Sequence, residues 1–336
     1  MPNWSETLAE IQEEFTKAKE ELEAQIAAQG GNFNNFGQAT NQLFGKAIDN
    51  VRHKYIQQVS EITGRNVIAY YSGWLHRGHA KAQIMDSDKA GFMLAIHKLD
   101  KTKGLDLILH TPGGDLAATE SIVDYLHSIF GTDIRAVIPQ ISMSAGTMIA
   151  LSCSEIIMGK HSNLGPIDPQ MGGLPCQAVL SEFKQAIEEI KSNPSSAVLW
   201  QAIYGKLNPT FLTGCAQAIK WSEELATKWL KQNMFHDNDG KAISVIKDFS
   251  DHQETKSHSR HISIDRCKEL GLKISDLESD KKLQDAVLTA HHCFMHTFSM
   301  SAAIKIVENQ NGQKLIEQAP IPQQNMPFPI AQQGQF

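Results

Sequence analysis

The spacing of apolar residues is helical towards both ends of the chain and shorter and more strand-like in the middle. Residues 5–28 and 38–63 carry apolar side chains three or four positions apart among many charges, which predicts two amphipathic helices. The Gly/Asn-rich residues 30–35 predict a linker between them. Residues 241–308 predict a further helical segment, and the Pro/Gln-rich C-terminus predicts a disordered tail.

In the middle of the chain, runs of β-forming residues alternate with helical periods. The apolar residues 105–109 predict a buried strand, and residues 111–114 form a Pro-Gly-Gly turn after it. Residues 115–130 predict an amphipathic helix, and residues 134–139 predict the next strand. This order is a βαβ crossover, which is typical of a parallel sheet and of the α/β class. We therefore expect four parts: a helical segment at 1–65, an α/β core at 66–235, a helical segment at 236–317 and a tail at 318–336.

Composition narrows the classes of function. The 336 residues carry a net charge of −6, so the whole chain has no electrostatic attraction to nucleic acid or to acidic lipid. The five cysteines are scattered without CxxC spacing, which favours free thiols in a reducing, cytoplasmic compartment. We expect no secretory signal and no membrane span, because no apolar run has the required length and flanks. A peripheral association with a membrane or a partner protein stays open.

The segment ISMSAGTMIALS at 141–152 is the strongest chemical feature. A strand-like run precedes it and a helix-like run at 147–151 follows, so Ser144 is expected in a sharp strand-to-helix turn. The N-terminus of a helix offers free N–H groups and the positive end of the helix dipole, which is where an acyl-transfer enzyme places its nucleophile. The alternative is a buried helix start with an N-cap serine.

The turn containing Gly113 and Gly114 strengthens the first interpretation of Ser144. A Gly-Gly pair after a strand is alone compatible with a plain turn or with a phosphate or CoA cradle. Because parallel neighbouring strands bring both turns to one sheet edge, we expect the N–H groups of Gly114 and Ala145 to converge on one oxyanion.

Other candidate residues have simpler explanations at this stage. Lys184, four positions before Glu188, fits a solvated surface lysine. The histidines do not show four-ligand spacing, so we expect no structural zinc and no cofactor. The histidines considered for zinc are His258, His261, His292 and His296.

The motifs HTPGGD (110–115), MSAGTMIA (143–150) and EIIMGKHSNLGPIDPQ (155–170), in this order, resemble the Clp/crotonase superfamily of serine peptidases. The proteolytic subunit of Clp protease and signal peptide peptidase A belong to it. The similarity is greatest to the family of serine dehydrogenase proteinases, over roughly residues 66–310. It implies an α/β fold with a Clp/crotonase-like ββα spiral core and added N- and C-terminal helices.

The same resemblance implies roles for individual residues. Ser144, rather than Ser142, matches the nucleophile. The donors of the oxyanion hole match Gly114 or Gly113, together with Ala145. The Clp histidine has no counterpart, because the corresponding turn contains Asp168, which is a candidate supporting residue.

A lysine on the following helix, as in relatives of signal peptide peptidase A, matches Lys184 as the general base. If Lys184 is not the base, His110, His161 or Asp168 are the next candidates.

The resulting hypothesis is an ATP-independent, cytoplasmic serine peptidase that forms an acyl-enzyme on Ser144, assembles as a homo-oligomer and acts on peptides or unfolded proteins. Two alternatives on the same fold are a crotonase-type acyl-CoA hydratase or isomerase and a catalytically inactive scaffold. The MSAGT segment argues against the hydratase, which needs no nucleophilic serine. The chain has no GxGxxG after a strand, so the sequence gives no support for a dehydrogenase.

Overall fold

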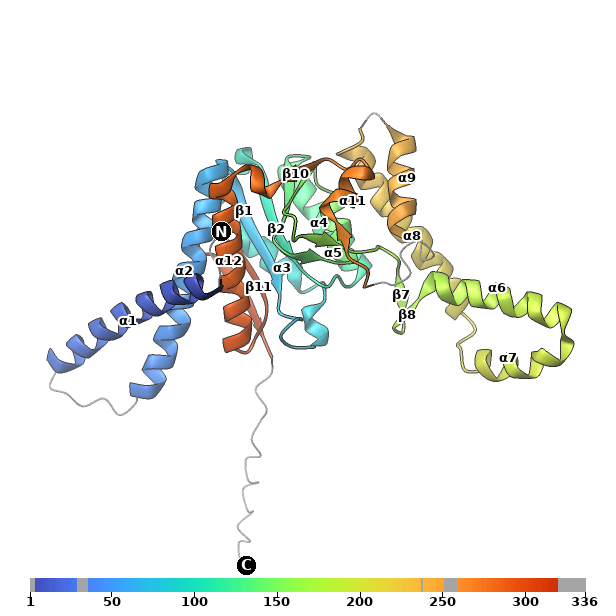
Figure 1. The fold of residues 1–336 in the computed structure, drawn as a ribbon, viewed down its shortest axis with the longest axis horizontal. Coiled ribbons are helices and arrows are strands. Elements are labelled where there is room, and N and C mark those ends of the chain that lie inside the picture. Colours follow the sequence, from blue (N-terminus) through green and yellow to red (C-terminus); the bar gives the residue numbers. More distant parts are fainter. Residues whose placement is uncertain (1–3, 29–35, 237, 251–258, 320–336) are drawn as a thin grey trace, which may run out of the picture.

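The computed structural model describes residues 4–28, 36–236, 238–250 and 259–319 (Figure 1). Its α-helices are α1 (Trp4–Ala28), α2 (Phe36–Thr63), α3 (Asp88–Ile96), α4 (Leu116–Phe130), α5 (Ala145–Leu151), α6 (Cys176–Ser192), α7 (Ala197–Tyr204), α8 (Phe211–Gln232), α9 (Asp239–Ser250), α11 (Ile264–Glu269) and α12 (Lys281–Met300). Its strands are β1 (Asn66–Ser72), β2 (Leu105–His110), β3 (Ile134–Ile138), β4 (Ile141–Ser142), β5 (Glu155–Met158), β6 (Asn163–Leu164), β7 (Gln170–Met171), β8 (Leu174–Pro175), β9 (Ile262–Ser263), β10 (Ile274–Asp276), β11 (Ala303–Asn309) and β12 (Lys314–Gln318).

A mixed seven-stranded sheet forms the centre, in the order β10-β5-β3-β2-β1-β11-β12. From β10 to β1 each neighbouring pair is parallel, whereas β11 is antiparallel to β1 and β12 is antiparallel to β11. Helices α3, α4 and α5 connect consecutive parallel strands, as crossovers must. The predicted strands at 105–109 and 134–139 and the helix between them are confirmed by β2, β3 and α4.

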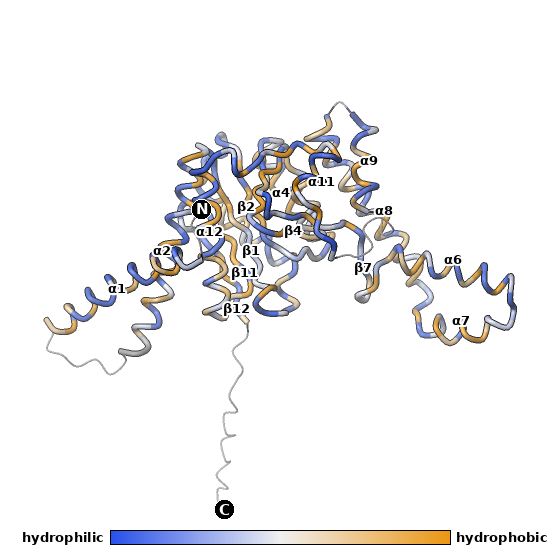
Figure 2. Tube along the Cα trace, in the orientation of Figure 1, coloured by the Kyte–Doolittle hydropathy of each residue, from blue (hydrophilic) through white to orange (hydrophobic). Residues whose placement is uncertain are grey.

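Both faces of this sheet are covered, so every residue of its inner strands β1 and β2 is buried, and hydrophobic residues run through the centre of the body (Figure 2). On one face, alternate residues of β2 such as Leu107 pack with Phe92 of α3, Ile122 of α4 and Trp229 of α8. On the other face, Ile108 packs in a second core with α2 and α12, where Phe294 is fully buried. Period-two alternation along the strands therefore supplies two cores at once.

Two helical arms extend from this body at opposite ends (Figure 1). Helix α1 and the N-terminal part of α2 form one arm, and α6 and α7 form the other. No residue of α7 is buried, although the helix is apolar, and its most exposed apolar side chains are Val198 and Leu199. The arm formed by α6 and α7 therefore leaves apolar surface without cover in the single chain.

The expectation of a wholly helical segment at 236–317 was wrong for its last part. Residues 303–309 and 314–318 form the hairpin β11–β12 at the edge of the central sheet, and β10 pairs with β5 at the other edge. The strand β11 was missed because Lys305 and Glu308 interrupt its apolar run, yet all seven of its residues are buried. The linker at 30–35 and most of the tail at 318–336 lie outside the described residues.

Helix α12 is more deeply buried than its histidines and other polar residues suggest. Most of its residues from Leu283 to Phe298 are buried, and it packs against α2. Among the helices that the structure describes, none combines the length and the apolar character needed to cross a membrane.

Candidate active site

Ser144 lies in a strained turn between β4 and α5. Its backbone has φ 51° and ψ −120°, a conformation that residues with a side chain rarely adopt. The turn is fixed by hydrogen bonds on both sides: the N–H of Gly146 donates to the carbonyl of Met143 at 2.8 Å, and that of Met148 donates to the carbonyl of Ser144 at 3.1 Å. Strain of this kind persists where the surrounding structure enforces it, and strained strand-to-helix turns are where serine hydrolases of the α/β class expose their nucleophile.

The space around this turn admits only a small residue at position 146. A Cβ added to Gly146 would lie 2.4 Å from Cγ2 of Thr111 and 2.6 Å from Oγ of Ser142. Thr111 also exchanges backbone hydrogen bonds with β4 and Met143, so the ends of β2 and β4 are directly joined. This junction brings the Gly113–Gly114 turn and the Ser144 turn to the same edge of the sheet, as the sequence predicts.

The Gly113–Gly114 turn lies directly against Ser144. Gly113 has φ 91°, and a Cβ added there would be 2.7 Å from Cβ of Ser144 and 2.9 Å from N of Ala145. Gly114 is bridged to Ile84: the N–H of Ile84 donates to the carbonyl of Gly113 at 2.8 Å, and that of Asp115 donates to the carbonyl of Ile84 at 2.9 Å. In this pairing the N–H of Gly114 points away from Ile84.

The N–H groups of Gly114 and Ala145 are both available. Neither donates a hydrogen bond to any acceptor in the part of the chain that the structure describes. Both residues line one cavity of about 320 Å³ together with Ser144. An oxyanion hole needs two such unused donors beside the nucleophile.

The walls of this cavity are formed by apolar and polar residues in similar measure. They include Leu116, Met148, Ile167 and Trp221, with Trp221 40% exposed at the rim. Asp115 also lines the cavity, but its carboxylate accepts from the N–H of Ala118 and caps α4. The cavity can therefore contact both apolar side chains and the polar backbone of a group held next to Ser144.

Comparison with known proteins agrees with this geometry. The profile of the family of ClpP-like SDH-type serine proteinases matches residues 46–289, which is most of the chain. The chain belongs to this family. Two similar proteins of Methanocaldococcus jannaschii are the uncharacterized protein MJ1495, 29% identical over 67% of this chain and 71% of its own length, and the uncharacterized protein MJ0137, 26% identical over 69% and 74%.

For this SDH-type proteinase, the structure does not bring Lys184 to Ser144 within one chain. Lys184 is exposed on α6, which projects from the body, and it does not line the cavity of Ser144 (Figure 1). Glu188, on the same helix face, pairs with Lys191 at 2.7 Å. The order of Ser144 and Lys184 along the chain therefore did not show that Lys184 lies outside the cavity of Ser144.

Asp168 and Ser142 are buried near Ser144 in the sequence but do not line its cavity. Asp168 is fully buried between Ile167 and Pro169, which do line the cavity. Burial raises the pKa of the Cys176 thiol to about 12, with smaller contributions from Cys215 and Asp168. Asp168 thus lies near Cys176, the first residue of α6. Ser142 is fully buried, and its hydroxyl has no hydrogen-bond partner among the described residues.

The sequence analysis missed the residues that hold and line the site from elsewhere. Gln83 and Ile84 come from the loop before α3, and Ser222 comes from α8. The hydroxyl of Ser222 donates to the carbonyl of Ile167 at 3.0 Å and fixes the far wall. An isolated strand-like residue such as Ile84 carries no periodic signal, so these contacts depend on tertiary structure.

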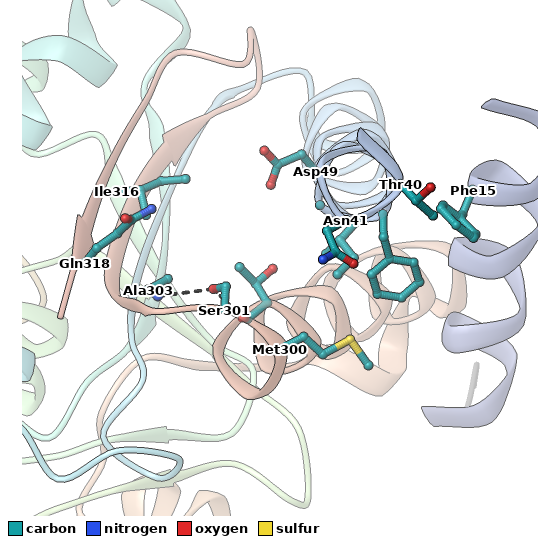
Figure 3. Close-up of a pocket in the computed structure, with 13 residues that line it drawn as sticks. Phe15, Thr40, Asn41, Asp49, Met300, Ser301, Ala303, Ile316 and Gln318 are labelled. Atoms are coloured by element: carbon teal, nitrogen blue, oxygen red, sulfur yellow. Dashed lines mark hydrogen bonds between the residues drawn. The ribbon is translucent and has the colours of Figure 1, made fainter. Parts of the chain in front are cut away.

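A larger cavity of about 720 Å³ lies away from Ser144, between α1, α2 and the hairpin β11–β12 (Figure 3). Its acidic residue Asp49 is already paired with Arg52 at 2.6 Å and with Lys314. The hydroxyl of Ser301 accepts from the N–H of Ala303 at 3.2 Å. This cavity offers no serine at a helix start with adjacent free N–H groups, so size alone does not mark the reactive site.

The buried histidines lie on the α12 face of the sheet. His110 ends β2 and contacts the rings of Trp74 at 4.4 Å and His291 at 5.1 Å. His296 packs on Trp4, while His261 is exposed and His258 lies outside the described residues. Within residues 4–28, 36–236, 238–250 and 259–319, no three His, Cys, Asp or Glu side chains come together as metal ligands would.

Burial of His110 predicts a loss of stability in acid. Burial lowers its pKa from 6.5 to about 3. In the unfolded chain this histidine binds a proton near pH 6.5, whereas in the folded protein it binds one only near pH 3. The free energy of unfolding therefore decreases as the pH falls from about 6.5 towards 3. At pH 5 this group costs about 2 kcal/mol relative to pH 8.

His110→Phe should remove that share of the pH dependence. We expect the decrease in free energy of unfolding between pH 8 and pH 5, measured by urea denaturation, to shrink by about 2 kcal/mol. His97→Asn, at an exposed position, is the matched control and should leave the decrease unchanged. An unaltered decrease in His110→Phe would show that the folded state accommodates the charged imidazole.

Proposed function

We propose that the protein is an ATP-independent serine peptidase that cleaves peptide bonds through an acyl-enzyme on Ser144. The observation that carries this proposal is the strained Ser144 beside two unused N–H groups, those of Gly114 and Ala145, in one cavity. Membership in a family of serine proteinases supports it. The parallel strands and crossover helices are compatible with a Clp/crotonase-like ββα spiral, which we propose as the core architecture.

The proposed chemistry follows from the positions of these groups. Oγ of Ser144 attacks the carbonyl carbon of the scissile bond, and its proton passes to a general base. The oxygen of the tetrahedral intermediate accepts from the N–H groups of Gly114 and Ala145. The protonated base then gives its proton to the leaving amine, and water hydrolyses the acyl-enzyme by the reverse sequence.

We further propose that Lys184 supplies the base from a second copy of the chain. Within one chain it is exposed on α6 and outside the cavity of Ser144. The same arm exposes the apolar residues Ile187, Val198, Leu199 and Ile203, which a second copy would cover. Closed homo-oligomers are the usual way in which such surfaces are buried.

Subunit mixing tests the shared site. Ser144→Ala and Lys184→Ala should each be inactive alone. When subunits of the two variants are mixed in equal amounts and exchanged, about a quarter of the sites should combine an intact Ser144 with a neighbour's intact Lys184. We therefore expect activity to reappear at roughly a quarter of the wild-type level, measured with a fluorogenic peptide, while light scattering reports the oligomer.

The controls separate this proposal from its competitors. Lys191→Ala, on the same exposed helix, should remain active. Full activity of Lys184→Ala alone would remove Lys184 from the mechanism and direct the search to His110, His161 and Asp168. A monomeric mass, or no recovery in a mixture shown to co-assemble, would contradict a site shared between copies.

A catalytically inactive scaffold is the second candidate, favoured by the exposure of Lys184 away from the nucleophile. An acyl-CoA hydratase or isomerase is less well supported, because it has no need of a strained serine between two free N–H groups. We propose the cytoplasm as the location, since all five cysteines are free and buried. Peptides or unfolded proteins are the substrates that we propose for this cavity.

A further inference from the structure

A buried ion pair joins the hairpin β11–β12 to the first residue of α3. Nζ of Lys305 lies 2.7 Å from Oδ1 of Asp88, and the two residues are 2% and 3% exposed. The ammonium also donates to the backbone carbonyl of Gln83 at 2.7 Å. The register of β11 shifts between Ala303 and Lys305, an irregularity of the kind that redirects a side chain.

Asp88 is held from its other side as well. Its Oδ2 accepts from the hydroxyl of Tyr70 at 2.7 Å and from the N–H of Met85 at 2.9 Å. Burial, with the charge of Asp88, raises the pKa of Tyr70 well above its usual value, so the hydroxyl remains a donor. The segment from Gln83 to Asp88 is therefore fixed at both ends by side chains that no solvent reaches.

Ile84 lies between these two fixed points and holds the oxyanion turn. Its N–H donates to the carbonyl of Gly113 at 2.8 Å, and its carbonyl accepts from the N–H of Asp115 at 2.9 Å. A Cβ added to Gly114 would lie 2.2 Å from N of Ile84, so the two backbones are in the closest contact that glycine permits. Any displacement of Ile84 therefore moves the N–H of Gly114.

We propose that Lys305 and Asp88 are positioning residues that set the oxyanion turn through Gln83 and Ile84. The proposal rests on the proposed function of Ser144 and Gly114. A buried ion pair contributes little net stability compared with apolar residues of similar size, so its value lies in the geometry that it fixes. Hydrogen bonds to an oxyanion depend on placement within a few tenths of an ångström, and this pair provides that placement.

The chain offers a matched control on the same strand. Glu308 of β11 is 1% exposed and pairs with the fully buried Arg52 at 2.7 Å. Arg52 also donates to the hydroxyl of Thr297, on the α12 side and away from Ser144. Loss of either cation leaves one buried carboxylate without that ion pair, Asp88 of α3 or Glu308 of β11, but only the loss of Lys305 releases the oxyanion turn.

The experiment compares Lys305→Met with Arg52→Met in the full-length chain. Turnover of p-nitrophenyl butyrate gives kcat and KM, and the rate of labelling by a fluorophosphonate probe gives the reactivity of Ser144. We expect Lys305→Met to lower kcat and the labelling rate by about 10- to 100-fold with KM within about twofold, because an oxyanion contact acts in the transition state. At a temperature at which it is folded, Arg52→Met should have kcat, KM and a labelling rate within about twofold of the wild-type values.

A second readout does not depend on catalysis. Amide hydrogen exchange at Asp115, whose N–H is bonded to Ile84, should accelerate in Lys305→Met and stay unchanged in Arg52→Met. If Lys305→Met does not fold, Asp88→Asn keeps the shape of the site and should show the same changes at smaller size. Equal kinetic and exchange effects in the two methionine variants would overturn the positioning role.

The proposed function of Ser144 and the positioning role of Lys305 can be rejected separately. A wild-type chain that neither hydrolyses the ester nor accepts the probe would reject the proposed function, and the exchange at Asp115 would still decide whether Lys305 fixes the turn. A reactive wild type with a Lys305→Met variant of equal reactivity would reject only the positioning role.

Discussion

Ser144→Ala is expected to abolish hydrolysis, with a decrease in kcat/KM of about 10⁴-fold or more for a fluorogenic peptide. The reason is geometric: Ser144 combines a strained backbone at a helix start with two unused N–H groups in one cavity. Alanine keeps the Cβ and removes only the hydroxyl, so the melting temperature should change little. Loss of activity without loss of structure would identify Oγ as the reacting atom.

Two serines near Ser144 serve as controls for this variant. Ser222 lines the same cavity, but its hydroxyl already donates to the carbonyl of Ile167. Ser142 is fully buried on the strand side of the turn. Ser222→Ala and Ser142→Ala should each retain activity within about tenfold. An inactive Ser142→Ala with a normal melting curve would move the nucleophile away from Ser144.

Gly113→Ala is the second change with a large expected effect, a decrease in kcat/KM of at least about 10²-fold. The added methyl group would lie 2.7 Å from both the carbonyl oxygen of Met143 and Cβ of Ser144. These atoms belong to a turn held by backbone hydrogen bonds and cannot move aside without displacing Ser144 or the N–H of Ala145. Kinetics with the same peptide, together with a thermal melt, measure the effect.

Gly173→Ala is the matched control for the backbone conformation. Gly173 has φ 80°, close to the 91° of Gly113, but a Cβ there meets no atom within 4 Å. Both variants carry similar backbone strain, of the order of 1 kcal/mol, and only one carries the clash with the site. Similar losses of activity in the two variants would attribute the effect to strain rather than to the oxyanion turn.

The local part of this site was readable in the sequence because it depends on short-range patterns. Strand, glycine turn, helix and strand follow one another between Leu105 and Ile138, and the resemblance to SDH-type proteinases is confirmed by the family match. A parallel pairing of β2 and β3 then brings the turns at Gly114 and Ser144 together. The spacing of the apolar residues and the glycines in the turn were sufficient to predict this arrangement.

The rest depends on tertiary contacts that leave no periodic trace. The bridge from Ile84 to Gly114 joins segments about thirty residues apart, and the ion pair of Lys305 and Asp88 joins segments separated by 217 positions. Met93 is 56% exposed because α3 packs through its neighbours Phe92 and Ile96 instead. Lys184 was assigned by its distance along the chain, which cannot reveal that α6 projects from the body.

Fluorophosphonate labelling of the full-length protein, followed by mass-spectrometric mapping of the adduct, tests the central claim most directly. We expect one adduct per chain, on Ser144, in wild-type protein and in Ser222→Ala, and none in Ser144→Ala. An adduct on a different residue, or a folded wild-type protein that resists the probe, would contradict a nucleophilic Ser144 served by the N–H groups of Gly114 and Ala145.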